Sequence, residues 1–383
     1  MAHCNTIFAQ MLKIMPRHEF ETLAKQHHRG RALRKASRWL QFVTMAMGQL
    51  TGRKSLRDVV ENLSAQAHRL YHLGSARLTR STLSRINEDK PYPLYEALFG
   101  KRLARCRNRP SGHRFRFNNK LYLLDASMID LCLSVFPWAQ YKTTKGAIKL
   151  HVGLDYEGSI PEFVSITEGK TGDVTARRVL QFPKGSIVVM DRGYIDYAWF
   201  NQLNTNKIFF VTRLKRGTRY RVMEHRQVDQ KQGLSSDQTI ELTAAKASKA
   251  CPIRLRRIGY RDPDTGTHYF FLTNHFKLSA KTIADIYKAR WQVELFFKWI
   301  KQNLKIKTFL GTSKNAVLTQ IWIELCVYLM LAFLKFQSKL ALSTQQILRL
   351  LQLNLFEKCD LMALLRGDPP QNQFVNDQQM ALL

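Results

Sequence analysis

The feature that most constrains the fold is the apolar run Ile-Val-Val-Met at residues 187–190, which Asp191 follows directly. β-branched residues favour strands, and a strand with no alternating polar residues is buried on both of its faces. Such a strand lies inside a sheet that helices cover on both sides. The run therefore predicts an α/β fold with an acid at the end of its central strand.

The pattern on either side of this run supplies the other elements of the sheet. Three β-rich segments with Gly and Asp turns precede it, which predicts three consecutive antiparallel strands. The element order becomes β-β-β-α-β-α-β, after which residues 216–275 are mostly strand-like and 279–304 form a long predicted helix. The predicted strands are 120–133, 147–156, 160–169, 185–195 and 207–215, with a crossover helix at 173–182.

The first third of the chain has a different pattern and a high positive charge. In residues 1–110 apolar residues recur at helical spacing, with Ser55 and Ser81 as predicted N-caps. The whole chain has 60 Lys and Arg against 29 Asp and Glu, a net charge of +31, and residues 1–120 alone hold 24 against 7. A basic helical block favours a polyanionic partner, with nucleic acid first and an acidic membrane surface second.

Two features argue against the membrane alternative. The most apolar stretch, 316–334, contains Gln320 and Glu324, which favours a buried helix over a membrane span. The beginning of the chain lacks the apolar core of a signal peptide, and the six cysteines are scattered without a CxxC pair. A reducing cytoplasmic location is therefore expected.

Three acids occupy informative positions. Asp125 ends the apolar run Leu-Tyr-Leu-Leu on the first predicted strand, and Asp191 ends the central strand. Active sites of open α/β sheets collect at the carboxyl ends of strands, and the helix that carries Glu294 can pack across those ends. Three clustered carboxylates need cations, and Mg²⁺ prefers oxygen ligands. We therefore expect a two-metal site for phosphodiester chemistry. The alternative is that both aspartates are ordinary strand-end turn residues.

The predicted helix 279–304 aligns further polar residues with Glu294. Tyr287, Arg290, Glu294 and Lys301 are three, four and seven residues apart, which places them on one helical stripe. The simplest interpretation is a solvated face with i,i+4 ion pairs from Arg290 to Glu294 and from Glu294 to Lys298. The alternative is a third metal ligand flanked by cations that bind phosphate.

These residues resemble a known family. The acid in Leu-Leu-Asp-Ala-Ser, the Asp-Arg-Gly-Tyr at 191–194, and the Tyr-x2-Arg-x3-Glu-x6-Lys pattern ending at Lys301 are similar to DDE transposases of bacterial insertion sequences, specifically the insertion-sequence-four (IS-four) family. The resemblance implies an RNase H-like core with a mixed sheet and a β-rich insertion, together with an all-α N-terminal DNA-binding domain. It implies cut-and-paste transposition through a hairpin intermediate, with two Mg²⁺ ions, for which Mn²⁺ can substitute.

The resemblance also assigns residues and partners. Asp125, Asp191 and Glu294 are the expected catalytic and metal-binding residues. The partners are the transposon terminal inverted repeats and target DNA, bound by a synapsed homodimer. The expected DNA-binding residues are Tyr287, Arg290, Lys298, Lys301, Arg192, Tyr194, Lys145 and Lys149. The expected segments are a DNA-binding domain at 1–110, a linker at 111–119, core segments at 120–215 and 276–310, an insertion at 216–275, and C-terminal helices for dimerisation at 311–383.

Two related functions remain as alternatives: an inactive transposase-derived DNA-binding protein, and an RNase H-fold nuclease without strand transfer. The presence of all three acids disfavours the first, and the insertion and the basic block disfavour the second. Hairpin closure favours an aromatic platform for an unstacked base, and the insertion has no Trp. Tyr220, which follows a basic turn, is the candidate there.

Overall fold

The computed structural model describes residues 5–34, 36–106, 117–143, 145–156, 160–169, 181–303 and 309–368. Their contacts divide the chain into two compact units. A helical unit joins Met1–Arg102 with Asn303–Leu383, and a sheet unit comprises Leu103–Gln302. Most of the predicted linker 111–119 and of the predicted crossover helix 173–182 lies outside the described residues.

The helical unit is built around α12 (Lys314–Ser338), which packs against α3, α5 and α13. α12 is long and apolar enough to cross a membrane, but 94% of its most apolar window is buried inside the protein, which confirms the prediction of a buried helix at 316–334. The other elements are α1 (Ile7–Leu12), α2 (Arg17–Gln26), α3 (Arg38–Leu50), α4 (Leu56–Ala65), η1 (Ala67–Arg69), η2 (Tyr71–Leu73), α5 (Arg80–Asp89), α6 (Pro93–Cys106), α13 (Thr344–Asn354) and α14 (Leu361–Arg366).

One of the two predicted N-caps in this unit is correct. Ser55 caps α4 by accepting a hydrogen bond from the Asp58 backbone N–H. The prediction of Ser81 as a cap is wrong, because α5 already begins at Arg80. Thr79 is the N-cap, and its side chain accepts the hydrogen bond from the Thr82 N–H. Thr and Ser both suit this position, so the two candidates could not be separated by residue type.

A buried polar cluster joins α12 to α3. Glu324 is fully buried, and its Oε1 accepts hydrogen bonds from Gln49 Nε2 at 2.5 Å and from Gln320 Nε2 at 2.8 Å. Burial raises the pKa of Glu324 well above its usual range, against the opposing effect of these two bonds. The folded state therefore favours the neutral carboxylic acid at this position.

We predict that Glu324→Gln stabilises the helical unit at alkaline pH. The pKa of Glu324 is raised in the folded state. Below the unfolded-state pKa the carboxyl is neutral in both states, so its ionisation does not lower the free energy of unfolding. That free energy falls as the pH rises through the folded-state pKa. The amide keeps an oxygen for Gln49 and Gln320 and cannot ionise. Urea denaturation should show a gain of about 1–3 kcal/mol at pH 8 and a much smaller gain at pH 5. Equal gains at the two pH values would contradict the assignment.

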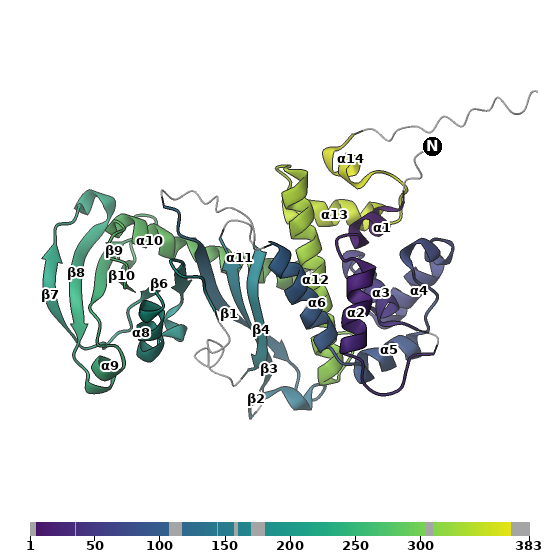
Figure 1. Ribbon diagram of the computed structural model, residues 1–383, viewed down its shortest axis with the longest axis horizontal. Coiled ribbons are helices and arrows are strands. Elements are labelled where there is room, and N and C mark those ends of the chain that lie inside the picture. The colour runs from purple at the N-terminus through teal and green to yellow at the C-terminus, as the bar shows by residue number, and fades with distance from the viewer. Residues whose placement is uncertain are drawn as a thin grey trace, which may run out of the picture. The chain divides into compact units, whose positions relative to one another are not determined.

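The sheet unit contains one mixed ten-stranded sheet in the order β2-β3-β1-β5-β6-β10-β9-β8-β7, with β4 also paired to β3 (Figure 1). β1, β5 and β6 run parallel, and the other pairs are antiparallel. This is the mixed sheet that the sequence predicts. The strands are β1 (Leu121–Leu131), β2 (Gln140–Lys142), β3 (Lys145–Asp155), β4 (Ile160–Glu168), β5 (Ile187–Met190), β6 (Phe209–Arg213), β7 (Tyr220–Arg226), β8 (Leu234–Leu242), β9 (Leu255–Arg261) and β10 (His268–Thr273).

The strands of residues 216–275 continue this sheet. β10 pairs antiparallel with β6, with Thr273 opposite Val211, and β9, β8 and β7 follow outward from it. Within the described residues, the only α-helix of this segment is α9 (Ala245–Ala250). The strand-rich segment is therefore an extension of the core sheet, joined to it by backbone hydrogen bonds.

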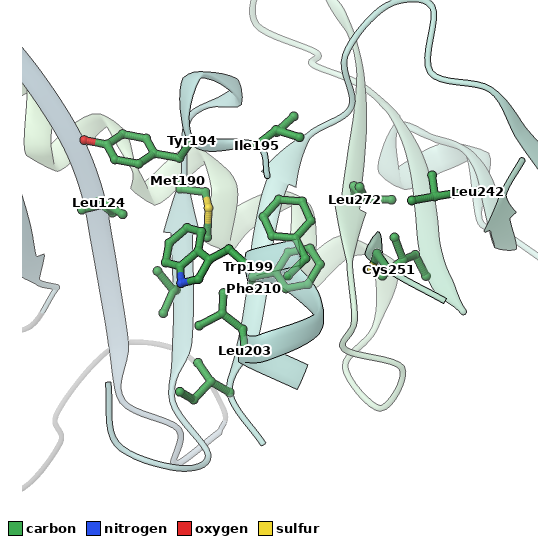
Figure 2. Packing of buried hydrophobic residues seen from close by; sticks show 14 of the residues in the cluster. Leu124, Met190, Tyr194, Ile195, Trp199, Leu203, Phe210, Leu242, Cys251 and Leu272 are labelled. Atoms are coloured by element: carbon green, nitrogen blue, oxygen red, sulfur yellow. The ribbon is translucent and has the colours of Figure 1, made fainter. Parts of the chain in front are cut away.

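Helices cover both faces of the sheet. On one face, α8 (Tyr197–Thr205) places Trp199 and Leu203 against Leu124, Met190 and Phe210 in a cluster of buried side chains (Figure 2). On the other face, α10 (Ala280–Ala289) contacts β5, β6, β8 and β9. β5 is fully buried, as its apolar sequence predicts.

The predicted helix 279–304 is divided at Arg290 into α10 and α11 (Trp291–Asn303). The Arg290 N–H bonds to the Tyr287 carbonyl and the Val293 N–H bonds to the Arg290 carbonyl, so both bonds span three residues. This is the tighter 3-10 geometry, which is common at functional hinges inside helices. The prediction of one continuous helix is corrected here, because a local change of hydrogen-bond partner leaves the side-chain periodicity almost unchanged.

Candidate active site

The parallel pairing of β1 with β5 brings two of the predicted acids together. Leu124 lies opposite Met190, so the next residues, Asp125 on β1 and Asp191 directly after β5, occupy neighbouring positions. Leu124 and Met190 pack against α8, and successive side chains of a strand point to opposite faces. Asp125 and Asp191 therefore lie on the face that α10 covers.

Arg290 joins Asp125 to the third predicted acid, Glu294. Its Nη1 lies 2.5 Å from Asp125 Oδ2, and its Nη2 lies 2.7 Å from Glu294 Oε1. The Arg290 side chain is 14% exposed, compared with 17% for Asp125 and 36% for Glu294. The predicted i,i+4 ion pair therefore exists, but the same guanidinium also binds an acid 165 positions away in sequence. This double contact brings the acids into one site.

Asp191 is held by different partners. Arg213, at the end of β6, places Nη2 3.3 Å from Asp191 Oδ1, and the Tyr287 hydroxyl donates to the same oxygen at 3.4 Å. The contact of Tyr287 with the site was expected from its place on the helical stripe. Arg213 was missed, although a cation directly after the residues Phe-Phe-Val-Thr is the same kind of signal as an acid directly after Ile-Val-Val-Met.

The carboxyl groups are close enough to alter one another's ionisation. Burial raises the pKa of Asp125 to about 6; Arg290 opposes this rise, and the charges of Asp191 and Glu294 add to it. Burial also acts to raise the pKa of Asp191, but the Arg192 backbone N–H and the guanidinium groups of Arg290 and Arg213 hold it below the usual value. Burial raises the pKa of Tyr287 to about 12, so its hydroxyl remains a donor.

The donor set suits a hard cation but is not preassembled around one. Among the described residues, no three His, Cys, Asp or Glu side chains form a cluster shaped to hold a metal ion. The reason is local: the Arg290 guanidinium lies between Asp125 and Glu294 and supplies the positive charge there. Oxygen donors from three acids match the preference of Mg²⁺, so the chemistry of these residues fits this ion.

The other predicted DNA-binding residues are placed unequally. Lys298 and Arg192 are exposed, and Lys301 is half-buried. Lys149 lies opposite Met128 in the pairing of β3 with β1, so strand alternation places it on the other face of the sheet from Asp125. Lys145, four residues earlier on β3, shares that face with Lys149.

The placement of Tyr194 argues against a role in DNA binding. Its side chain is 1% exposed and packs in the cluster under α8, and its hydroxyl shares a 3.0 Å hydrogen bond with Nδ1 of the buried His151 (Figure 2 shows Tyr194). His151 Nε2 lies 3.0 Å from the Thr167 hydroxyl. Tyr194 therefore anchors the turn after Asp191 to β3 and β4.

Trp291 is a feature of the site that sequence reasoning did not single out. It directly follows Arg290, and it is 59% exposed, which is unusual for the largest apolar side chain. Leu295, one turn further along α11, is also exposed at 48%. The available signal was the Trp itself, in the first position after the Arg of the motif.

Comparison with known proteins identifies the family. A family model described as "Transposase DDE domain" matches residues 117–330, which is more than half of the chain. A second model, described as "Domain of unknown function (DUF4372)", matches residues 3–76. The chain therefore belongs to the DDE transposase family. The predictions of a DDE transposase and of an RNase H-like core are confirmed.

Individual relatives agree with this assignment. The chain is 35% identical over 256 residues to "Putative transposase y4zB" of Sinorhizobium fredii, covering 65% of this chain and 70% of the relative. It is 30% identical over 268 residues to "Probable transposase for insertion sequence element IS5377" of Geobacillus stearothermophilus, covering 70% of each. Among solved structures, a piggyBac transposase synaptic complex with hairpin DNA has a TM-score of 0.46 and 10% identity, over 96% of this chain and 81% of that chain.

We predict that Arg290→Ala destabilises the sheet unit in the absence of divalent metal. The change leaves Asp125 and Glu294 without their shared counter-ion, which should lower the free energy of unfolding by about 2 kcal/mol in urea denaturation. The double variant Arg290→Ala/Asp125→Asn should recover part of this loss, because one of the unpaired charges is gone. Strict additivity of the two single changes would contradict the coupling.

Proposed function

We propose that the protein catalyses cut-and-paste transposition of an insertion sequence, with Asp125, Asp191 and Glu294 as its catalytic residues. The observation that carries the proposal is the contact of one guanidinium, Arg290, with both Asp125 and Glu294, beside the adjacent Asp191. Acids that only end a strand or begin a turn would not be expected to share one guanidinium with a distant acid. Membership of the DDE transposase family supports the same roles.

The three carboxylates are the proposed ligands of two Mg²⁺ ions. Bound there, the ions would activate the attacking oxygen and stabilise the leaving oxygen of a phosphodiester. In this proposal Arg290 leaves the two carboxylates and binds the phosphate. Its planar guanidinium can donate to two phosphate oxygens as well as to two carboxylates. Arg213 and Tyr287 hold Asp191 in orientation through their contacts with Oδ1.

DNA binding is proposed on the side of the sheet that bears the acids. Arg192, Lys298 and Lys301 are the candidate phosphate contacts there, and the positive charge of the chain favours a polyanionic partner. The partners proposed are the terminal inverted repeats and target DNA, bound by a homodimer in the cytoplasm. Lys145 and Lys149, on the opposite face, are left for a second DNA segment.

The proposed reaction has four steps. Water cuts one strand at each transposon end, and the freed 3′-hydroxyl attacks the opposite strand and closes a hairpin on the transposon end. Water then reopens the hairpin, and the 3′-hydroxyl attacks target DNA. Every step is a substitution at phosphorus by an oxygen nucleophile, so one site can serve all four.

We predict that Asp125→Asn, Asp191→Asn and Glu294→Gln each reduce first-strand nicking by at least about a thousandfold, a typical scale for loss of a key electrostatic group. Binding to transposon-end DNA in gel shifts should remain, because each change removes negative charge near phosphate. Asp130→Asn is the matched control: it lies on β1, is exposed, and by alternation faces away from Asp125. Normal nicking by any of the three variants would remove that residue from the mechanism.

Trp291 is the better candidate for stacking on an unpaired base during hairpin closure. A base that leaves the helix costs a few kcal/mol, and an exposed aromatic ring can offset this cost by stacking. Trp291 is next to Arg290 and 59% exposed. Tyr220, the candidate from sequence, is half-buried against the α8 cluster, and the Arg257 guanidinium lies 5.4 Å from its ring centroid. Trp291 therefore replaces Tyr220 in the proposal.

We predict that Trp291→Ala leaves first-strand nicking within about twofold of wild type and lowers hairpin formation by at least about tenfold, equivalent to 1–2 kcal/mol of lost stacking. Trp291→Phe should recover part of the hairpin product. Leu295→Ala is the control, because it removes exposed apolar surface one turn away on the same helix. Equal loss of nicking and hairpin formation would assign Trp291 to DNA binding or folding instead.

A further inference from the structure

The helical unit contains a cavity of about 370 Å³ that has no role in the chemistry described above. Its walls come from α1, from the start of α2, from Trp39 of α3 and from the turn that follows η2. All of its lining residues lie between positions 9 and 74, within the domain of unknown function matched at 3–76. A ligand of this cavity would therefore be a ligand of that domain.

The lining of the cavity has a single electrostatic character. Lys13, Arg17 and His72 are exposed at its rim, and no lining residue is an acid. The inner wall is apolar and rigid: Trp39 is 4% exposed, and its indole N–H donates to the Leu73 carbonyl at 2.9 Å. The two cations Lys13 and Arg17, above an apolar floor, favour an anion whose other side is not charged.

Two backbone features direct donors into the same space. Gly74 has φ of +60°, and a Cβ at this position would collide with the Arg17 guanidinium, so the absence of a side chain lets Arg17 lie against the turn. Arg17 Nε is fixed by Glu21 Oε1 at 2.7 Å. Pro16 precedes α2 and offers no capping side chain, so the positive end of this ten-residue helix opens at Pro16 and Arg17 in the cavity wall.

An exposed aromatic ring stands beside this rim. Tyr71 is 86% exposed, and its ring lies edge-on to His72 with 5.8 Å between centroids. A free inorganic anion gains nothing from such a ring, whereas the sugars and bases next to a phosphate can contact it. The rim is also open to solvent, which suits a phosphate that belongs to a long polymer.

We propose that this cavity binds a backbone phosphate of DNA, and that the domain at 3–76 uses Lys13, Arg17, His72 and the first turn of α2 to hold it. The proposal rests on the proposed function, because it takes transposon-end DNA as the polymer. It assigns the domain one phosphate contact at a defined place, separate from the contacts near the three acids.

The test compares the full-length double variant Lys13→Ala/His72→Ala with wild type. Duplex affinity is measured by fluorescence anisotropy over a range of salt concentrations. The double variant should bind about fivefold more weakly at physiological salt, with a slope of log K against log salt shallower by about one, as for one lost phosphate contact. The control is Lys25→Ala, an exposed lysine on the same α2, which should stay within twofold of wild type.

Several outcomes would overturn the proposal. A double variant with the slope and affinity of the Lys25→Ala control would exclude a DNA phosphate in the cavity. Binding of inorganic phosphate by wild type but not by the double variant in calorimetry, with the duplex slope unchanged, would make it a site for free phosphate. If thermal melting shows that the double variant is destabilised, the single charge reversal Lys13→Glu at an exposed position gives the same comparison. Absence of any duplex binding by wild type would instead refute the proposed function itself.

Discussion

The active-site geometry depends first on the parallel pairing of β1 with β5. The register that places Leu124 opposite Met190 makes Asp125 and Asp191 neighbours, although 65 residues separate them in sequence. Parallel pairing is possible only when a long connection returns the chain to the same end of the sheet. Slippage of this register by one residue would turn Asp191 towards the α8 side, where the cluster around Trp199 leaves no room for a charge. The apolar residues on that side therefore keep the acids on the other.

The second constraint is electrostatic. Three carboxylates cannot lie together without compensation, and in the described structure Arg290 and Arg213 supply it. Arg290 lies between the end of α10 and the start of α11, and from there it contacts both Asp125 and Glu294. Trp291, the first residue of α11, is 59% exposed.

The fold and much of the site could be predicted from local patterns. Asp125 and Asp191 were found because each directly follows an apolar strand, and Glu294 because its helix places Arg290 and Tyr287 on the same stripe. The break at Arg290 was not predictable, because it only shifts the carbonyl acceptors of two backbone hydrogen bonds by one residue. The burial of Tyr194 depends on His151, which lies 43 positions earlier and gives no signal of its own. Continuation of the core sheet into residues 216–275 also required long-range pairing, because strand propensity does not specify the partner strand.

The packing of α12 inside the helical unit has a consequence for synthesis of the chain. The N-terminal helices bury their apolar faces against a helix that ends at Ser338, and the backbone of Ile7 and Phe8 bonds to the carbonyls of Glu357 and Leu355. A ribosome makes these partners after all the residues of the sheet unit, Leu103–Gln302. The helical unit can therefore complete its core only after the residues up to Glu357 have been made, and until then its early helices expose apolar surface. A message broken before α12 yields a chain whose helical unit lacks the helix against which α3 and α5 pack.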